Sequence, residues 1–373
     1  MKKHIILLCV LLLSMPVRAE EPSVSAKSAV VLEYATGKTV YAKNENEKLP
    51  MASTTKIMTA LLALERGNLS DIITIGPKAA GVEGSSMYLK AGEQLSLEEL
   101  LYGLMLSSGN DAAVAIAEHI AGSEEAFAKM MTDRAVALGC TNTSFQNANG
   151  LPNDNHYTTA LELARITGKA LENPKFREIA ASKSARVGMR QLTNHNKLLS
   201  MYEGAIGVKT GFTKASGRTL VSAAVRDGVE LIAVTLSAPD DWDDHMKMLD
   251  YGFANMERRH LATGNAIAGA VTVADGTKTD VQVCFAGDFS ISVCKSEKTE
   301  IQYILPQSVA APIHKGAEVG KAEFYLEGIK MGEVGLISGE TVDALAQPTL
   351  FDYFYIVIIK WVNLFMDFPK ISI

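Results

Sequence analysis

Cysteine and basic residues are both scarce in this chain. Four cysteines among 373 residues exclude a scaffold held together by many disulfides. Acidic residues outnumber basic ones by 42 to 36, which gives a net charge of -6. No Lys/Arg cluster offers the basic face that phosphate binding needs, so we expect no nucleic-acid partner. The seven histidines are scattered, without a His-Glu-x-x-His or paired Cys/His spacing. The sequence therefore gives no support for a metal site, and we expect no cofactor.

The first 19 residues have the pattern of an export signal. Lys2 and Lys3 precede an apolar run from Ile5 to Leu13, and Val17-Arg18-Ala19 is a small-x-small cleavage site. The apolar run is well short of the ~20 residues that span a bilayer. We therefore expect cleavage after Ala19 and an exported mature protein.

Residues 20–260 predict an α+β domain in which one antiparallel sheet packs against helices. Two β-rich runs around a turn form a hairpin signal at 28–44, and three more strands with short turns fill 205–236. Helical patterns lie between these strands, at 51–66, 96–107, 111–121, 123–138 and 158–171, and one follows them at 243–256. Asp111 is placed to cap the helix at 111–121. A single sheet built from both ends of the domain is the simplest arrangement.

The remaining sequence predicts two further parts. Residues 261–346 contain short β runs with frequent turn signals, which indicates a small all-β domain. Residues 347–373 predict an amphipathic helix, because five polar residues fall within a sector of about 80° at 100° per residue: Asp352, Lys360, Asn363, Asp367 and Lys370. Lys360 near the middle of this segment favours a helix lying on a membrane surface over one spanning it.

Ser53-Thr54-Thr55-Lys56 is the first candidate catalytic motif. Positions i and i+3 share one face of a helix, so Lys56 can reach the hydroxyl of Ser53. A desolvated lysine loses proton affinity and can then accept the serine proton. Taken alone, the motif is also typical of a serine N-cap followed by a surface lysine.

Two further motifs follow in an order that makes the set specific. Ser108-Gly109-Asn110 lies in the turn between two predicted helices, and Lys209-Thr210-Gly211 lies on a predicted strand. Each alone also fits an ordinary turn or strand end. Together with Ser-x-x-Lys they form the pattern of penicillin-recognising serine acyltransferases.

The sequence resembles the low-molecular-mass penicillin-binding proteins that act as D-alanyl-D-alanine carboxypeptidases, serine peptidase family S11. Beyond the three motifs, the resemblance includes ATGKTVYAKN, ASTTKIMTALLALE, NANGLPNDNHYTTALELA and GVKTGFTKASGRTLVSAA, and so covers most of residues 25–256. It implies a penicillin-binding, serine β-lactamase-like catalytic domain, followed by a small β domain and a C-terminal amphipathic helix.

The resemblance also implies a mechanism. Ser53 would attack the carbonyl between the two terminal D-alanines of a peptidoglycan stem peptide, with Lys56 accepting its proton. Ser108 and Asn110 would relay protons and hold the substrate amide, while Lys209 and Thr210 would bind the terminal carboxylate. Gly211 would let the substrate lie against the strand. The backbone N–H groups of Ser53 and Phe212 would form the oxyanion hole.

The resemblance further implies that β-lactams would acylate the same serine. The enzyme would be held at the outer face of the cytoplasmic membrane by its C-terminal helix.

Several alternatives remain open from the sequence. The same fold could serve a DD-endopeptidase, a transpeptidase, a β-lactamase or a catalytically silent cell-wall binding protein. The Glu-x-x-Leu-Asn setting of class A β-lactamases is absent between Asn110 and Lys209. The arginine that some relatives use for the substrate carboxylate is also absent, and Arg218 is a substitute or a solvated strand residue. Cys284 and Cys294 fall in adjacent predicted strands, but a turn centred on Gly287 disfavours a disulfide between them.

Overall fold

The computed structural model describes residues 20–347 and 349–365, so the expected signal, residues 1–19, lies outside the described residues. The chain divides into two compact units, each described here by itself. The first runs up to Arg258 and includes Ser292–Ser296. The second comprises Arg259–Ile291 and the residues from Glu297 onward.

A five-stranded antiparallel sheet forms the centre of the first unit. Its strand order is β2-β1-β9-β8-β7, with bounds Thr39–Lys43, Ser28–Glu33, Val229–Leu236, Gly217–Arg226 and Ala205–Thr213. The N-terminal hairpin pairs with the last strand of the β7-β8-β9 meander, Val30 lying opposite Val234. The expected single sheet built from both ends of the domain is therefore present.

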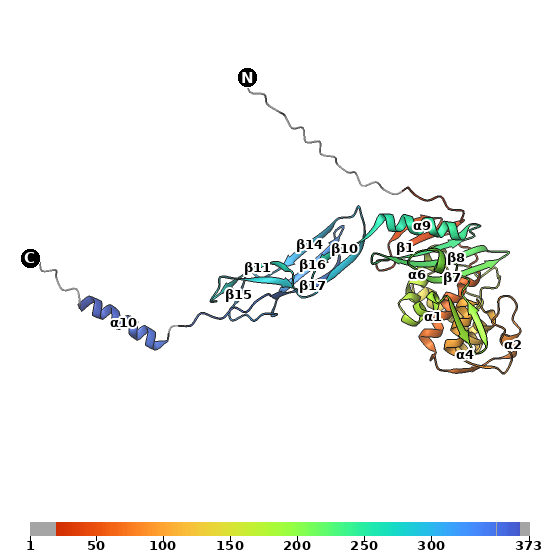
Figure 1. Cartoon of the computed structure of the whole chain (residues 1–373), viewed down its shortest axis with the longest axis horizontal. Helices are drawn as coiled ribbons and strands as arrows, with labels where there is room; N and C mark the ends of the chain where they lie inside the picture. Colours follow the sequence, from red (N-terminus) through yellow and green to blue (C-terminus); the bar gives the residue numbers. More distant parts are fainter. Residues whose placement is uncertain (1–19, 348, 366–373) are drawn as a thin grey trace, which may run out of the picture. The chain divides into compact units, whose positions relative to one another are not determined.

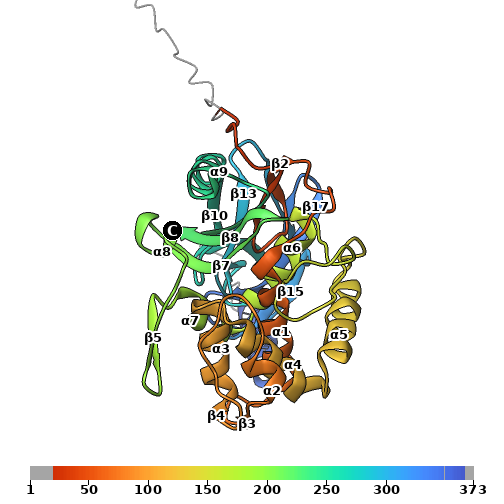
Figure 2. The same cartoon turned by 90° about the vertical axis from the view of Figure 1, so that its right-hand side faces the viewer.

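A hydrophobic core lies on each face of this sheet. Alternate residues of a strand point to opposite faces and so belong to different cores. On β1, Val30 and Leu32 belong to a large core shared with most of the helices, whereas Ala29 and Val31 belong to a second core beneath α9 (Asp241–Asn255). Figures 1 and 2 show the sheet between α9 on one side and the helices that include α1 and α4 on the other. The predicted α+β arrangement, one antiparallel sheet packed against helices, is confirmed.

The remaining elements of the first unit are short helices and two small hairpins. The helices are η1 (Ala52–Thr55), α1 (Lys56–Arg66), α2 (Pro77–Ala80), α3 (Leu97–Leu106), α4 (Asn110–Ala121), α5 (Glu124–Ala137), α6 (Ala160–Leu171), α7 (Pro174–Ala181) and α8 (Leu198–Met201). The hairpins pair β3 (Ile72–Thr74) with β4 (Gln94–Ser96), and β5 (Ser184–Val187) with β6 (Arg190–Thr193). The sequence patterns did not indicate these hairpins or the helices α2, α7 and α8.

The second unit is the expected small β domain. Its six-stranded sheet has the order β14-β16-β17-β12-β11-β15, with bounds Thr299–Ile304, Glu318–Leu326, Ile329–Ser338, Asp280–Phe285, Ile267–Ala274 and Ser308–Ala310. Its core contains Val283, Phe324 and Leu336. The chain passes between the units three times: within β10 (Met256–Ala262), within β13 (Phe289–Cys294) and between Ser296 and Glu297. Within the described chain no disulfide joins Cys284 of β12 to Cys294 of β13.

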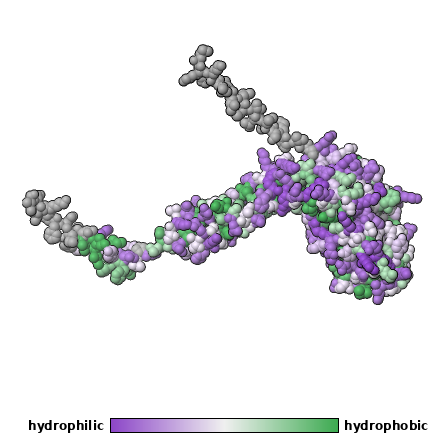
Figure 3. All heavy atoms as spheres, in the orientation of Figure 1, coloured by the Kyte–Doolittle hydropathy of each residue, from purple (hydrophilic) through white to green (hydrophobic). Residues whose placement is uncertain are grey.

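The C-terminal helix α10 spans Leu350–Phe365. Thr349 directly precedes it. The Thr349 hydroxyl accepts a hydrogen bond from the backbone N–H of Asp352, and the Asp352 carboxylate accepts one from the N–H of Thr349. This reciprocal pair satisfies free N–H groups at the helix start. Large apolar side chains along α10 are exposed, Phe351 by 86% and Phe354 by 71%, and Figure 3 shows them as a hydrophobic surface. Of the expected polar stripe, Asp367 and Lys370 lie outside the described residues. No helix in the described ranges is long and apolar enough to cross a membrane.

Candidate active site

Ser53 and Lys56 meet where a short 3-10 turn becomes a buried helix. The helix expected at 51–66 starts as η1, and only from Lys56 onward is it α-helical. The turn is fixed through the carbonyl oxygen of Met51, which accepts hydrogen bonds from the hydroxyls of Thr54 (2.6 Å) and Thr219 (3.1 Å). Nζ of Lys56 lies 3.0 Å from Oγ of Ser53. The sequence-predicted nucleophile and base are thus within hydrogen-bond reach of each other.

Two carbonyl oxygens also accept hydrogen bonds from the Lys56 amine. Nζ lies 2.7 Å from Oδ1 of Asn110 and 2.6 Å from the backbone carbonyl oxygen of Asn149. Lys56 is fully buried. Burial holds its pKa well below the usual range, and the nearby charge of Lys209 lowers the pKa further, whereas Asp111 opposes the shift. A buried lysine with a depressed pKa is suited to work as a base.

Asn110 joins this amine to the loop between α2 and β4. Its amide nitrogen donates to the carbonyl of Glu83 at 2.6 Å, and its backbone N–H donates to the carbonyl of Ser85 at 2.7 Å. Because the Glu83 oxygen can only accept, the amide oxygen of Asn110 must face Lys56. One side chain therefore fixes both the amine and the loop.

Asp111 does not cap α4 as the sequence suggested. The N-cap is Gly109, without a side-chain cap. The buried Asp111 carboxylate instead accepts hydrogen bonds from the hydroxyl of Ser86 (2.6 Å) and the backbone N–H groups of Met87 (3.1 Å) and Leu89 (3.0 Å). The cap expectation failed because α4 begins at Asn110, which puts Asp111 inside the first turn. The carboxylate is therefore free to fasten the loop that holds Asn110.

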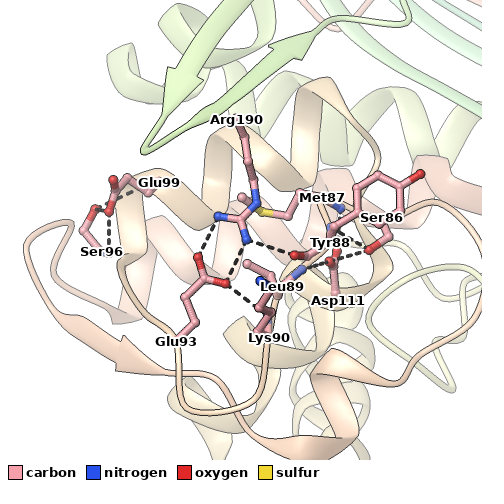
Figure 4. Close-up of polar contacts among 10 residues, drawn as sticks. All are labelled: Ser86, Met87, Tyr88, Leu89, Lys90, Glu93, Ser96, Glu99, Asp111 and Arg190. Carbon is pink, nitrogen blue, oxygen red and sulfur yellow. Dashed lines mark hydrogen bonds and ion pairs between the residues drawn. The ribbon is translucent and has the colours of Figure 1, made fainter.

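Arg190 of β6 secures the outer part of the same loop, as Figure 4 shows. Its guanidinium makes a two-pronged ion pair with Glu93 (2.6 and 2.8 Å) and donates to the carbonyl of Tyr88 at 2.9 Å. Hydrogen bonding from Arg190 lowers the pKa of the Glu93 carboxyl. The Tyr88 ring remains 82% exposed. The loop thus has one buried fastening point at Asp111 and one at the surface at Arg190.

The third motif lies on β7, at the edge of the sheet beside Ser53. A Cβ on Gly211 would lie 3.0 Å from the backbone nitrogen of Ser53 and 2.4 Å from Oγ1 of Thr219. Only glycine therefore allows β7 this close to the nucleophile. Lys209 is buried, its Nζ donates to the carbonyl of Thr210 at 2.9 Å, and burial lowers its pKa to about 7. The Phe212 side chain is 64% exposed.

Ser108 is the motif residue with the least direct contact to the nucleophile and the two lysines of the site. It lies in the loop between α3 and α4 with a positive φ of 55° and is 4% exposed. Its neighbour Asn110 contacts Lys56, but within the described residues the Ser108 hydroxyl forms no hydrogen bond with Ser53, Lys56 or Lys209.

Arg218 lies opposite Phe212 in the β7-β8 pairing. Its Nε donates to Oδ1 of the buried Asp241 at 2.9 Å, and its side chain is 43% exposed. The guanidinium is therefore held by a carboxylate at the start of α9, and neither of the two sequence interpretations of Arg218 anticipated this pairing.

Sequence reasoning missed the segment after α5 that completes the site. Gly150 has a φ of +89°, and a Cβ there would lie 1.9 Å from the carbonyl oxygen of Ala52, so the segment packs directly against η1. The Asn149-Gly150 dipeptide is a turn signal that could have marked this point. The role of Asn149 is carried by its main chain, for which residue type gives no signal.

His156 supports η1 from the same segment. Its Nδ1 accepts from the backbone N–H of Gln146 at 3.0 Å, so Nε2 carries the proton and donates to Oγ1 of Thr55 at 2.7 Å. Burial, assisted by the charge of Lys56, lowers its pKa to about 4. His156 is therefore a neutral structural group. No cluster of three or more His, Cys, Asp or Glu in the described ranges could hold a metal ion.

Known proteins match both units. The family described as D-alanyl-D-alanine carboxypeptidase, Peptidase S11, matches residues 15–240, and the penicillin-binding protein 5 C-terminal domain matches residues 257–344. Among curated relatives, D-alanyl-D-alanine carboxypeptidase DacF of Bacillus subtilis is 36% identical over 334 residues, which cover 85% of each chain. DacC of Escherichia coli is 34% identical over 344 residues, which cover 87% of this chain and 86% of that protein.

Solved structures agree with the sequence relatives. Penicillin-binding protein 5 of Haemophilus influenzae superposes with a TM-score of 0.65 at 29% identity, covering 87% of this chain and 99% of that one. A DD-transpeptidase of Streptomyces K15 has a TM-score of 0.61 at 34% identity, covering 63% of this chain and all of that one. The chain therefore belongs to the D-alanyl-D-alanine carboxypeptidase family, the serine peptidases of family S11.

Proposed function

We propose that Ser53 is the nucleophile with which this D-Ala-D-Ala carboxypeptidase removes the terminal D-alanine from peptidoglycan stem peptides. The observation that carries the proposal is the surroundings of the Lys56 amine: two carbonyl oxygens, those of Asn110 and Asn149, and one hydroxyl, that of Ser53. A neutral amine has two N–H donors and one lone pair. Carbonyl oxygens can only accept, so they take both donors, and the lone pair faces the Ser53 hydroxyl.

Acylation follows from this arrangement. The lone pair of Lys56 takes the proton of Ser53 as Oγ attacks the carbonyl carbon between the two D-alanines. The peptide C–N bond then breaks, and the leaving amine receives a proton from the Lys56 ammonium, directly or through Ser108. D-Alanine departs with both of its hydrogens on nitrogen, and Ser53 carries the acyl group as an ester.

Groups on β7 and on η1 bind the terminal carboxylate of the substrate and the oxyanion that forms during attack. Lys209 and Thr210 hold the terminal carboxylate. The backbone N–H groups of Ser53 and Phe212 receive the negative charge that develops on the attacked carbonyl oxygen, and the contact of Gly211 with the Ser53 backbone supports this assignment. Asn110 binds the substrate amide beside the nucleophile.

Deacylation returns the enzyme to its starting state. Lys56 is neutral again after protonating the leaving amine, and it removes a proton from water as the oxygen attacks the ester. The ester C–O bond then breaks, and the Lys56 ammonium returns that proton to Oγ of Ser53. The shortened peptide leaves as a carboxylic acid, which ionises in water. β-Lactams bind the same site and acylate Ser53.

The test is D-alanine release from a pentapeptide ending in D-Ala-D-Ala, with nitrocefin hydrolysis measured in parallel. We expect release by the parent, slow nitrocefin turnover, and loss of both in Ser53→Ala. Fast nitrocefin turnover without D-alanine release would instead indicate a β-lactamase. Activity that survives in Ser53→Ala would refute the assignment of Ser53 as the nucleophile.

We further propose that the protein is exported and held at the outer face of the cytoplasmic membrane by α10. The export pattern of residues 1–19 supports the first part. The exposed apolar side chains of α10 support the second, because a helix with a wide apolar face binds in the plane of the membrane interface.

Vesicle flotation with the full chain and with a form lacking residues 347–373 tests the anchor. We expect the full chain alone to float with vesicles of phosphatidylethanolamine and phosphatidylglycerol. Equal flotation of both forms would exclude α10 as the anchor. N-terminal sequencing of the exported protein tests the signal, with Glu20 as the expected first residue.

A further inference from the structure

A cavity of about 380 Å³ adjoins the nucleophile. Its walls come from three segments of the first unit: residues 48–52 before Ser53, residues 150–157 after α5, and Thr213 and Ala215 at the end of β7. Ala52 and Gly150 are both in its lining, and Gly150 packs against the backbone of residues 52 and 53. The cavity therefore begins next to the reacting serine.

Its place along β7 identifies the part of the substrate that can reach it. The proposed carboxylate site is at Lys209 and Thr210, Gly211 lies against the backbone of Ser53, and Thr213 lines the cavity. At a rise of about 3.3 Å per residue, Thr213 is about 13 Å along the strand from Lys209, beyond Ser53. A peptide extended along β7 with its terminal carboxylate at Lys209 thus brings the residues that precede the two D-alanines to the cavity.

Two side chains of opposite charge, Lys48 and Asp154, line this cavity. Lys48 is exposed, with Nζ 5.0 Å from the ring centroid of Tyr157, an aromatic contact that positions the ammonium group. Asp154, on the wall segment formed by residues 150–157, is also exposed. Within the described residues neither side chain forms an ion pair. His156 supplies no third charge, because both of its ring nitrogens are occupied by Gln146 and Thr55.

We propose that this cavity binds the side chain of the stem-peptide residue that precedes the two D-alanines, and that Lys48 and Asp154 select a side chain ending in both a carboxylate and an ammonium group. Diaminopimelate has such a side chain, whereas lysine offers only the ammonium group. Lys48 binds the carboxylate and Asp154 binds the ammonium group. The inference rests on the proposed function, because it takes the scissile bond to lie at Ser53.

Two pentapeptides that differ only at this residue, meso-diaminopimelate or L-lysine, test the assignment in the full chain. The readout is kcat/KM for D-alanine release. We expect the parent to favour the diaminopimelate peptide by about three- to fivefold, the upper part of the range for one exposed ion pair. Lys48→Met removes that preference and leaves the rate on the lysine peptide within about twofold. Asp154→Asn lowers the rates on both peptides by a similar factor, because both carry the ammonium group.

Two controls separate this subsite from the catalytic machinery. Lys183→Met removes another exposed lysine, at the start of the β5 hairpin, and should keep the parent preference. Penicillin, which lacks a side chain with an ammonium group and a carboxylate, should acylate all four proteins at the same rate. Equal parent rates on the two peptides, or the same fold loss on both in Lys48→Met, would overturn the subsite while the carboxypeptidase stands. Release from neither peptide would overturn the proposed function and the subsite with it.

Discussion

The carbonyl oxygen of Asn149 lies 2.6 Å from Nζ of Lys56, although 93 residues separate them in the chain. Together with Asn110, this carbonyl takes both donors of the neutral amine and directs its lone pair at Ser53. The base is therefore aligned by acceptors from two other segments of the chain, in addition to its helical position three residues after the serine.

Lys56→Arg should leave the fold intact and nearly abolish acylation. A guanidinium stays protonated at any accessible pH, so it cannot accept the serine proton. We expect the second-order rate of penicillin acylation to fall by about 10²- to 10⁴-fold. The control is Lys183→Arg, an exposed lysine outside the site. Near-normal acylation by a stably folded Lys56→Arg protein would show that Lys56 acts only through its charge.

kcat/KM should have a pH optimum and decrease at both lower and higher pH. On the acidic side it rises with pH, because Lys56 must lose its proton to act as a base. On the alkaline side it falls above about pH 7, because burial lowers the pKa of Lys209 to about 7 and a neutral Lys209 binds the carboxylate weakly. Bound substrate places a negative charge beside Lys209 and raises its pKa, so kcat should hold its value to higher pH than kcat/KM.

Lys209→Arg distinguishes this explanation from others, because arginine keeps its charge throughout the range. We expect the alkaline fall in kcat/KM to disappear in this variant, whatever its absolute rate. The profile is measured as initial D-alanine release at substrate concentrations well below KM. An alkaline fall at the same pH in both proteins would assign it to another group.

The sequence predicts the contacts of this site that are made by side chains within short sequence motifs. Ser53, Lys56 and Asn110 meet as their motifs suggest, because a helical turn fixes the first pair and a turn between two helices presents the third. The hairpin and meander were readable because their alternation and turn residues are local. The side of the sheet on which each residue lies follows from that alternation.

The rest depends on contacts that no local pattern contains. Asp111 has the residue type of a helix cap, yet its carboxylate binds the loop about 25 residues earlier. Arg218 has the pattern of a solvated strand residue, yet Asp241 at the start of α9 binds it. Asn149 acts through its main chain, which every residue type shares. In each case a tertiary partner determines the role.

Asp111→Asn should loosen the loop and lower both stability and activity. The amide nitrogen of asparagine would face at least one of the donors now bound to the carboxylate, and a buried donor without an acceptor costs about 1–3 kcal/mol. Since the same loop supplies the carbonyls that hold Asn110, penicillin acylation should slow as well. Thermal unfolding and acylation are measured alongside Asp71→Asn, in which the replaced carboxylate lies at the surface. Unchanged acylation despite lower stability would separate the loop from the alignment of Asn110.

Gly211→Ala should damage the site with little effect on the sheet as a whole. The new Cβ would lie 2.4 Å from Oγ1 of Thr219 and 3.0 Å from the backbone nitrogen of Ser53, so β7 and η1 must separate. A displacement of about 1 Å at the reacting atoms can cost roughly 100-fold in rate, and we expect a loss of that order in acylation. Gly168→Ala is the matched control, because its Cβ would meet only Cδ1 of Ile232 at 3.6 Å. Within α6 the same substitution should even stabilise the protein, by up to about 1 kcal/mol. Full acylation activity in Gly211→Ala would mean that β7 need not lie this close to Ser53, and the oxyanion role assigned to Phe212 would fall with it.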